Sequence, residues 1–100
     1  MIVQFRTRRL EKCYTTHKHA FRTWGDVVGR RYIQRINTIK TVRSLDELFL
    51  IGELKCHPLK GDRNGQYAMS LTGFWRLIFT LRGERFEIVF LEEVSKHYDD

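Results

Sequence analysis

The 100-residue chain is long enough for one domain with a modest core, and its hydrophobic content of 42% excludes a disordered tail. No apolar run approaches the roughly 20 residues of a membrane-spanning helix, and Ile2–Phe5 runs straight into Arg6 without the apolar region of a signal peptide. We therefore expect a single domain over residues 1–100 that works in the cytoplasm and has no membrane partner.

The net charge of +6 is divided unevenly along the chain. Residues 1–43 carry eleven Lys and Arg against two acids, a balance of +9, whereas residues 44–100 carry seven against ten, a balance of −3. A polycationic segment favours binding to nucleic acid or to an acidic protein, because neutralising phosphates releases counterions. An ordinary solvated basic surface explains the same charge equally well.

The first half of the chain has the apolar spacing of helices. After a short strand at Ile2–Phe5, the apolar residues predict a first helix from about Thr7 to His17. We expect a loop around Phe21–Gly25 and then a second, basic amphipathic helix whose apolar face runs from Val28 to Arg43. Ser44–Glu47 has the spacing of a capping box, which predicts a short third helical turn.

From about Leu54 onward the apolar period changes from helical to alternating, which predicts strands over residues 67–72, 75–82 and 86–91. One face of the middle strand carries Trp75, Leu77, Phe79 and Leu81. Helices followed by strands with short turns indicate an α+β fold, in which an N-terminal strand and two helices pack on one face of a small, mainly antiparallel, twisted sheet. Arg76 is then expected on the open face of that sheet.

The segment His57–Tyr67 is polar, is punctuated by glycines and lies between two predicted strands. It brings an imidazole, His57, and two cations, Lys60 and Arg63, within a short span. Cations offset the charge of a phosphoryl oxygen and a histidine moves a proton near neutral pH, so phosphate chemistry suits this set. From spacing alone, a solvated basic hairpin loop is the simpler interpretation.

The segments HPLKGDRNGQY (57–67) and GFWRLIF (73–79) together resemble the signature of the HigB branch of the RelE/ParE toxin superfamily. In that signature a histidine, any residue, a leucine, a lysine and a glycine precede an acidic residue, a basic residue and a glycine, and an aromatic-arginine-aliphatic strand follows. The order of the predicted elements fits as well, so the resemblance covers essentially the whole chain. It implies a RelE-like fold and the toxin of a type II toxin–antitoxin system.

The resemblance implies a ribosome-dependent mRNA endoribonuclease that needs no metal or other cofactor. The implied step is attack of a ribose 2′-hydroxyl on the adjacent phosphate, which needs acid/base groups and positive charge at the phosphate. In this step His57 would move a proton, Lys60 would neutralise the phosphate or stabilise the leaving side, and Arg76 would hold the scissile phosphate.

The same resemblance implies the partners of the protein. These are a HigA-like helix-turn-helix antitoxin encoded by a neighbouring gene, the ribosome and mRNA, with operator DNA reached only through the antitoxin complex. Arg30, Arg31 and Arg35 of the second helix and Arg63 of the loop are the predicted RNA contacts. The polycationic first half would meet ribosomal RNA or an acidic antitoxin.

The C-terminal end departs from the family pattern. Many relatives finish with Asp-Tyr-His, whereas this chain reads SKHYDD over residues 95–100. His97 and Tyr98 still supply an imidazole and a phenol, which we interpret as a second proton-transfer group and a base-stacking ring, with the division of the two roles left open.

Two other functions stay open at this point. ParE relatives share the frame and inhibit DNA gyrase without cleaving RNA, although the presence of His57 and Lys60 argues against that function. A catalytically inactive module that binds RNA or an antitoxin would account for the basic charge equally well. Cys13 and Cys56 are too few and too far apart for a disulfide scaffold or a zinc quartet, so we expect free, buried thiols.

Overall fold

The computed structural model of the chain describes residues 1–96. Its elements, in chain order, are β1 (Ile2–Phe5), α1 (Arg8–Thr15), α2 (His17–Thr41), α3 (Leu45–Leu50), η1 (Gly52–Leu54), β2 (His57–Pro58), η2 (Gly61–Arg63), β3 (Tyr67–Ser70), β4 (Trp75–Arg82) and β5 (Ile88–Lys96), where η denotes a 3₁₀ helix. None of the helices in this part of the chain is long and apolar enough to cross a bilayer.

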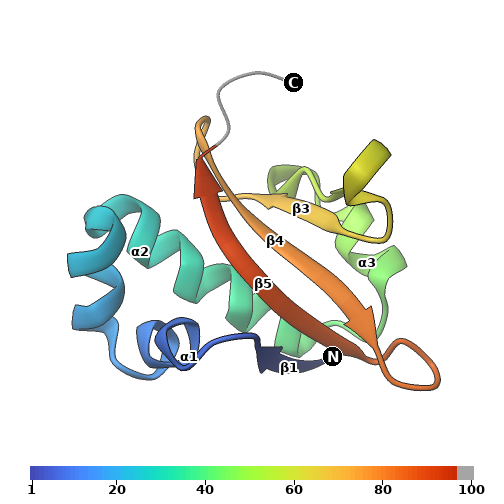
Figure 1. The fold of residues 1–100 in the computed structure, drawn as a ribbon, viewed down its shortest axis with the longest axis horizontal. Coiled ribbons are helices and arrows are strands. Elements are labelled where there is room, and N and C mark those ends of the chain that lie inside the picture. Colours follow the sequence, from blue (N-terminus) through green and yellow to red (C-terminus); the bar gives the residue numbers. More distant parts are fainter. Residues whose placement is uncertain (97–100) are drawn as a thin grey trace.

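The strands form one five-stranded sheet in the order β1-β5-β4-β3-β2. β1 pairs in parallel with β5, and the other three pairings are antiparallel. Figure 1 shows the long, twisted β4–β5 hairpin at the centre of the sheet, with β1 along the far side of β5. The predicted α+β class and mainly antiparallel sheet are confirmed.

The helices pack on one face of this sheet and form the core with it. The hydroxyl of Tyr32, on α2, donates a hydrogen bond to the carbonyl of Leu10, on α1, at 2.7 Å. α1 begins after Thr7, whose hydroxyl accepts a hydrogen bond from the Leu10 amide, an N-cap interaction. The largest buried side chains of the core are those of Tyr32, Ile36, Ile39, Leu48, Leu54, Met69, Leu71, Leu77, Phe79 and Leu91.

The loop predicted around Phe21–Gly25 is wrong, because α2 runs from His17 to Thr41 and only Gly25 leaves the helical conformation. Gly25 has φ 85° and ψ 170°, a region that only glycine adopts readily. The resulting kink turns the first part of the helix against the second. A Cβ on Gly29 would lie 2.9 Å from the carbonyl carbon of Ala20, so the absence of a side chain allows this close approach.

Two smaller expectations also need correction. The Ser44 hydroxyl makes no capping hydrogen bond to α3, although Glu47 does accept one from the Arg43 amide at 3.2 Å. The last strand runs from Ile88 to Lys96, and not over residues 86–91 as predicted. It begins later because Phe86 has φ 54° and belongs to the turn after Gly83.

The face of the sheet away from the helices is partly covered. Ala68 and Ile78, which pair across β3 and β4, are fully buried there although they lie outside the main core cluster. Arg63, from η2, reaches over this face to Glu93, the β5 partner of Ile78. The expectation of an open face therefore holds only in part, since the 59–66 loop folds toward it.

Candidate active site

His57 and Arg76, which are 19 positions apart in the sequence, line one pocket of about 160 Å³. The strand register explains their proximity. His57 pairs with Ala68 and Arg76 pairs with Ser70, and residues two apart on a strand share a face of the sheet. The remaining lining residues are Lys55, Ala68, Ser70, Thr72, Gly73, Phe74 and Trp75.

The ring of His57 is oriented by the main chain. Its Nδ1 atom lies 2.8 Å from the carbonyl oxygen of Lys55. A carbonyl only accepts, so Nδ1 carries a proton in this contact and Nε2 is the nitrogen left available for proton transfer. The imidazole is exposed, so a ligand can reach it.

Arg76 lies half-buried on β4, with its backbone between those of Ser70 on β3 and Ser95 on β5. Its Nε atom is buried and has no hydrogen-bond partner among residues 1–96. A buried donor without a partner costs about 1–3 kcal/mol, and guanidinium groups bind phosphate oxygens well. Because Arg76 lines the pocket, its positive charge makes the site suited to an anionic ligand.

Lys60 and Arg63, the other two cations of the predicted loop, do not line this pocket. Lys60 is exposed immediately before η2. Arg63 donates a hydrogen bond to the side chain of Gln66 at 3.3 Å and forms an ion pair with Glu93 at 3.7 Å. The structure thus brings His57 together with Arg76 and leaves the two loop cations outside the pocket.

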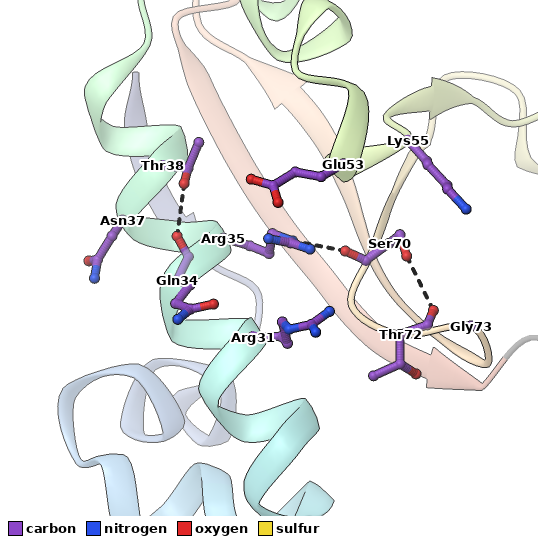
Figure 2. Close-up of a pocket in the computed structure, with 10 residues that line it drawn as sticks. All are labelled: Arg31, Gln34, Arg35, Asn37, Thr38, Glu53, Lys55, Ser70, Thr72 and Gly73. Carbon is purple, nitrogen blue, oxygen red and sulfur yellow. Dashed lines mark hydrogen bonds between the residues drawn. The ribbon is translucent and has the colours of Figure 1, made fainter.

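Two of the three predicted RNA-binding arginines of α2 make hydrogen bonds inside the chain. Arg31 donates to the carbonyl of Leu71 and Arg35 to that of Ser70, both at 2.9 Å. Figure 2 shows both guanidinium groups pointing from α2 toward the β3–β4 turn, in a second pocket of about 740 Å³. Arg35 is only 6% exposed, and burial lowers the pKa of its guanidinium. Arg30 and Arg31 are both exposed.

The predicted residues His97 and Tyr98 lie outside the described residues. Of the pocket residues that the sequence analysis did not predict, Lys55 is the charged one. The sequence holds no signal for it, because its role depends on a left-handed backbone, with φ 48° and ψ 38°, that lysine rarely adopts. Lys55 also lines the second pocket, so it lies where the two pockets meet.

The cysteines and acids near the site do not form a metal centre. Within residues 1–96, no three His, Cys, Asp or Glu side chains cluster so that they could hold a metal ion. Cys56 is a free, half-buried thiol beside His57, and burial raises its pKa to about 12. It therefore stays protonated near neutral pH and is poorly suited to act as a nucleophile. Cys13 is free and buried, as expected.

Comparison with known proteins identifies the fold. No protein-family model matches the sequence, and no curated protein matches it. Solved structures do match. A YoeB/ParE toxin from Agrobacterium tumefaciens has a TM-score of 0.66 and 16% identity, with 98% of this chain and 100% of that chain covered.

Two further matches are toxins solved in complexes. The structure of the E. coli DinJ-YafQ toxin-antitoxin complex gives a TM-score of 0.57 at 20% identity over 95% of this chain and 90% of that one. The YoeB-YefM complex from Staphylococcus aureus gives 0.55 at 18% identity over 98% of each chain. The protein therefore has the α+β fold of the YoeB- and YafQ-type toxins.

Proposed function

We propose that this protein is the toxin of a type II toxin–antitoxin pair and that it cleaves mRNA on the ribosome. The observation that carries the proposal is the pocket in which His57 lies with Arg76, whose buried Nε lacks a partner among residues 1–96. The toxin fold supports it, as does the HigB-like order of residues around His57. A cytoplasmic site of action follows from the proposed target.

The proposed reaction is an internal transfer at phosphorus. The ribose 2′-oxygen attacks the adjacent phosphorus as His57 Nε2 takes the 2′-hydroxyl proton. The bond from phosphorus to the 5′-oxygen breaks, and that oxygen receives a proton from a second group. The products are a 2′,3′-cyclic phosphate and a 5′-hydroxyl, so no water is consumed. General acid–base catalysis of this kind is worth about a hundredfold to ten-thousandfold in rate.

Positive charge supplies the other part of the proposed mechanism. Arg76 holds the scissile phosphate, and the additional charge that develops on its oxygens is offset most strongly in a pocket shielded from water. Lys60, on the neighbouring loop, is proposed to neutralise the phosphate or to stabilise the leaving oxygen. His97 and Tyr98 remain our proposed second proton-transfer group and base-stacking ring, with no division of roles between them.

The proposed partners follow from charge and from the neighbours. Arg30, Arg31, Arg35 and Arg63 are proposed as the RNA-binding set. Arg30 and Arg31 are exposed and would make direct contacts, whereas Arg35 is buried and donates a hydrogen bond to the Ser70 carbonyl. Two structural neighbours were solved with antitoxins, DinJ and YefM, which supports an antitoxin partner for this chain. A HigA-like, helix-turn-helix antitoxin is the finer proposal.

The proposal is tested by inducing the chain in growing bacteria without an antitoxin and mapping transcript 5′ ends. We expect growth arrest and new cleavage ends in translated mRNA for the parent, and neither for His57→Ala. The matched control is His17→Ala, which removes an exposed histidine at the start of α2. Unchanged mRNA with a DNA-damage response would instead indicate gyrase inhibition. Unchanged mRNA and normal growth would indicate an inactive binding module.

A further inference from the structure

We propose that Lys55 contacts the substrate in the active pocket, with its ammonium group on the RNA phosphates and its main-chain carbonyl holding His57. This inference rests on the proposed function and deepens it, because it assigns a second cation to the pocket that contains Arg76. Three observations carry it. They are the backbone conformation of Lys55, its contact with His57, and the charge of the pocket walls.

The backbone of Lys55 is in the left-handed region, with φ 48° and ψ 38°. Among residues 1–96 only Phe86 shares a positive φ without being glycine. A non-glycine residue in this region costs on the order of 1 kcal/mol and persists where the surroundings or a function require it. The Lys55 amide is held at the end of η1 by a hydrogen bond to the Gly52 carbonyl at 3.2 Å.

This conformation turns the Lys55 carbonyl toward the ring of His57, whose Nδ1 it meets at 2.8 Å. The contact fixes the tautomer that leaves Nε2 available, as in a catalytic histidine that is oriented through its other nitrogen. The carbonyl belongs to the backbone, so any residue that keeps the left-handed conformation retains it. The side chain of Lys55 is therefore free to serve a separate purpose.

The two pockets that meet at Lys55 differ in charge. On the α2 side, Arg31 and Arg35 face Glu53, and Figure 2 shows the Lys55 side chain pointing away from both arginines. On the other side, the pocket with His57 has Lys55 and Arg76 in its walls and no acidic residue among its described lining. Two cations in the wall of a pocket whose described lining has no acidic residue attract a phosphate group, which such a pocket can admit.

Lys55 thereby has the role of the phosphate-binding cation, which the resemblance implied for Lys60. Lys60 lies before η2 and outside the pocket wall, whereas Lys55 is part of it. We predict that removing the charge of Lys55 impairs cleavage more than removing that of Lys60. The resemblance alone gives a role to Lys60 and none to Lys55.

The test separates the ammonium from the backbone. Lys55→Asn removes the charge and keeps a residue that tolerates the left-handed region, so the carbonyl contact with His57 is preserved. Lys55→Arg keeps the charge. Lys60→Asn is the comparison within the loop, and Arg85→Asn is the control for loss of one positive charge, at an exposed arginine between β4 and β5.

Cleavage of a defined mRNA is measured on purified translating ribosomes with each protein. We expect kcat/KM to fall at least about tenfold for Lys55→Asn, less for Lys60→Asn, to recover most of that loss in Lys55→Arg, and to stay near the parent value for Arg85→Asn. Parent-like cleavage by Lys55→Asn overturns the inference. Equal loss in Lys55→Arg and Lys55→Asn also overturns it, because the charge would then be irrelevant.

Measuring RNA binding without cleavage distinguishes failure of the Lys55 inference from failure of the proposed function. Affinity for a single-stranded RNA with 2′-O-methyl riboses, which blocks the attacking hydroxyl, is measured against salt concentration. The slope of log K against log salt should decrease by about 0.7 for Lys55→Asn, the value for one lost phosphate contact. A lowered slope with no cleavage by the parent would reject the nuclease and keep the Lys55 contact. An unchanged slope, or no RNA binding by the parent, overturns the Lys55 inference.

Discussion

Arg35 donates a hydrogen bond from its Nε atom to the main-chain oxygen of Ser70 at 2.9 Å, which ties helix α2 to strand β3. On its other side, Ser70 is the strand partner of Arg76, whose own Nε has no partner within residues 1–96. The two arginines beside Ser70 thus differ in whether their Nε atom has a hydrogen-bond partner. The first ties a helix to the sheet, and the second lines the candidate pocket with its Nε unpaired in the described part of the chain.

Arg35→Met should destabilise the protein by about 1–3 kcal/mol, because the Ser70 carbonyl loses a buried charged donor. The free energy of unfolding is measured by urea denaturation. Arg30→Met, on an exposed position of the same helix, serves as the control and should stay within about 0.5 kcal/mol of the parent. Equal effects of the two substitutions would show that the Arg35 tether contributes nothing.

Arg76→Met should have the opposite profile. Removing a buried donor that lacks a partner should leave the free energy of unfolding unchanged or raise it by up to about 2 kcal/mol, while ribosomal mRNA cleavage falls at least about a hundredfold. Arg82→Met is the contrast on the same strand, since Arg82 lies 3.5 Å from the centre of the Phe90 ring and should lose about 0.5–1 kcal/mol with cleavage retained. A large loss of stability in Arg76→Met would indicate a structural role.

Tyr32→Phe should cost about 1–3 kcal/mol because the Leu10 carbonyl loses its donor. Burial, with a smaller contribution from Cys13, raises the pKa of Tyr32. A raised folded-state pKa means that this stabilisation is complete below the unfolded value of about 10 and is lost as pH rises above it. Thermal unfolding from pH 8 to 11 should therefore show a steeper decline for the parent than for Tyr32→Phe, and parallel curves would contradict this.

Gly25→Ala should destabilise the kink in α2 by about 1–3 kcal/mol, because φ 85° with ψ 170° is unfavourable for any residue with a Cβ. Gly52→Ala is the matched control. Its Cβ would meet nothing within 4 Å and its φ is not positive, so stability should stay the same or rise by about 0.4–1 kcal/mol. Guanidinium unfolding of both variants checks the difference, and an unaffected Gly25→Ala would argue against the kink.

Local patterns predicted the elements where the chain obeys one period. The alternation over residues 75–82 predicted β4 with its bounds, and it predicted Arg76 on the face of the strand opposite to that of Leu77 and Phe79. The expected loop at Phe21–Gly25 was wrong because Gly25 alone breaks the helix, and sequence cannot distinguish a one-residue kink from a loop. The parallel pairing of β1 with β5 joins residues more than 80 positions apart, which no local period reports.

The site was only partly predictable for a similar reason. His57 and Arg76 could be named from the order of residues, but their common pocket depends on the register of β2, β3 and β4. Lys55 escaped notice because its role depends on a left-handed backbone, which lysine rarely adopts. The internal hydrogen bonds of Arg31 and Arg35 were hidden because an arginine on a helix has the same sequence signature whether it is tethered or free.

The most direct measurement of the central claim is the chemistry of the RNA ends. Purified protein is added to ribosomes stalled on a defined mRNA, and the fragments are mapped and their termini identified. We predict one cut in the translated region, with a 2′,3′-cyclic phosphate and a 5′-hydroxyl, and we expect His57→Ala to slow it about a hundredfold to ten-thousandfold. Intact mRNA, or equal cleavage by the parent and His57→Ala, would contradict it.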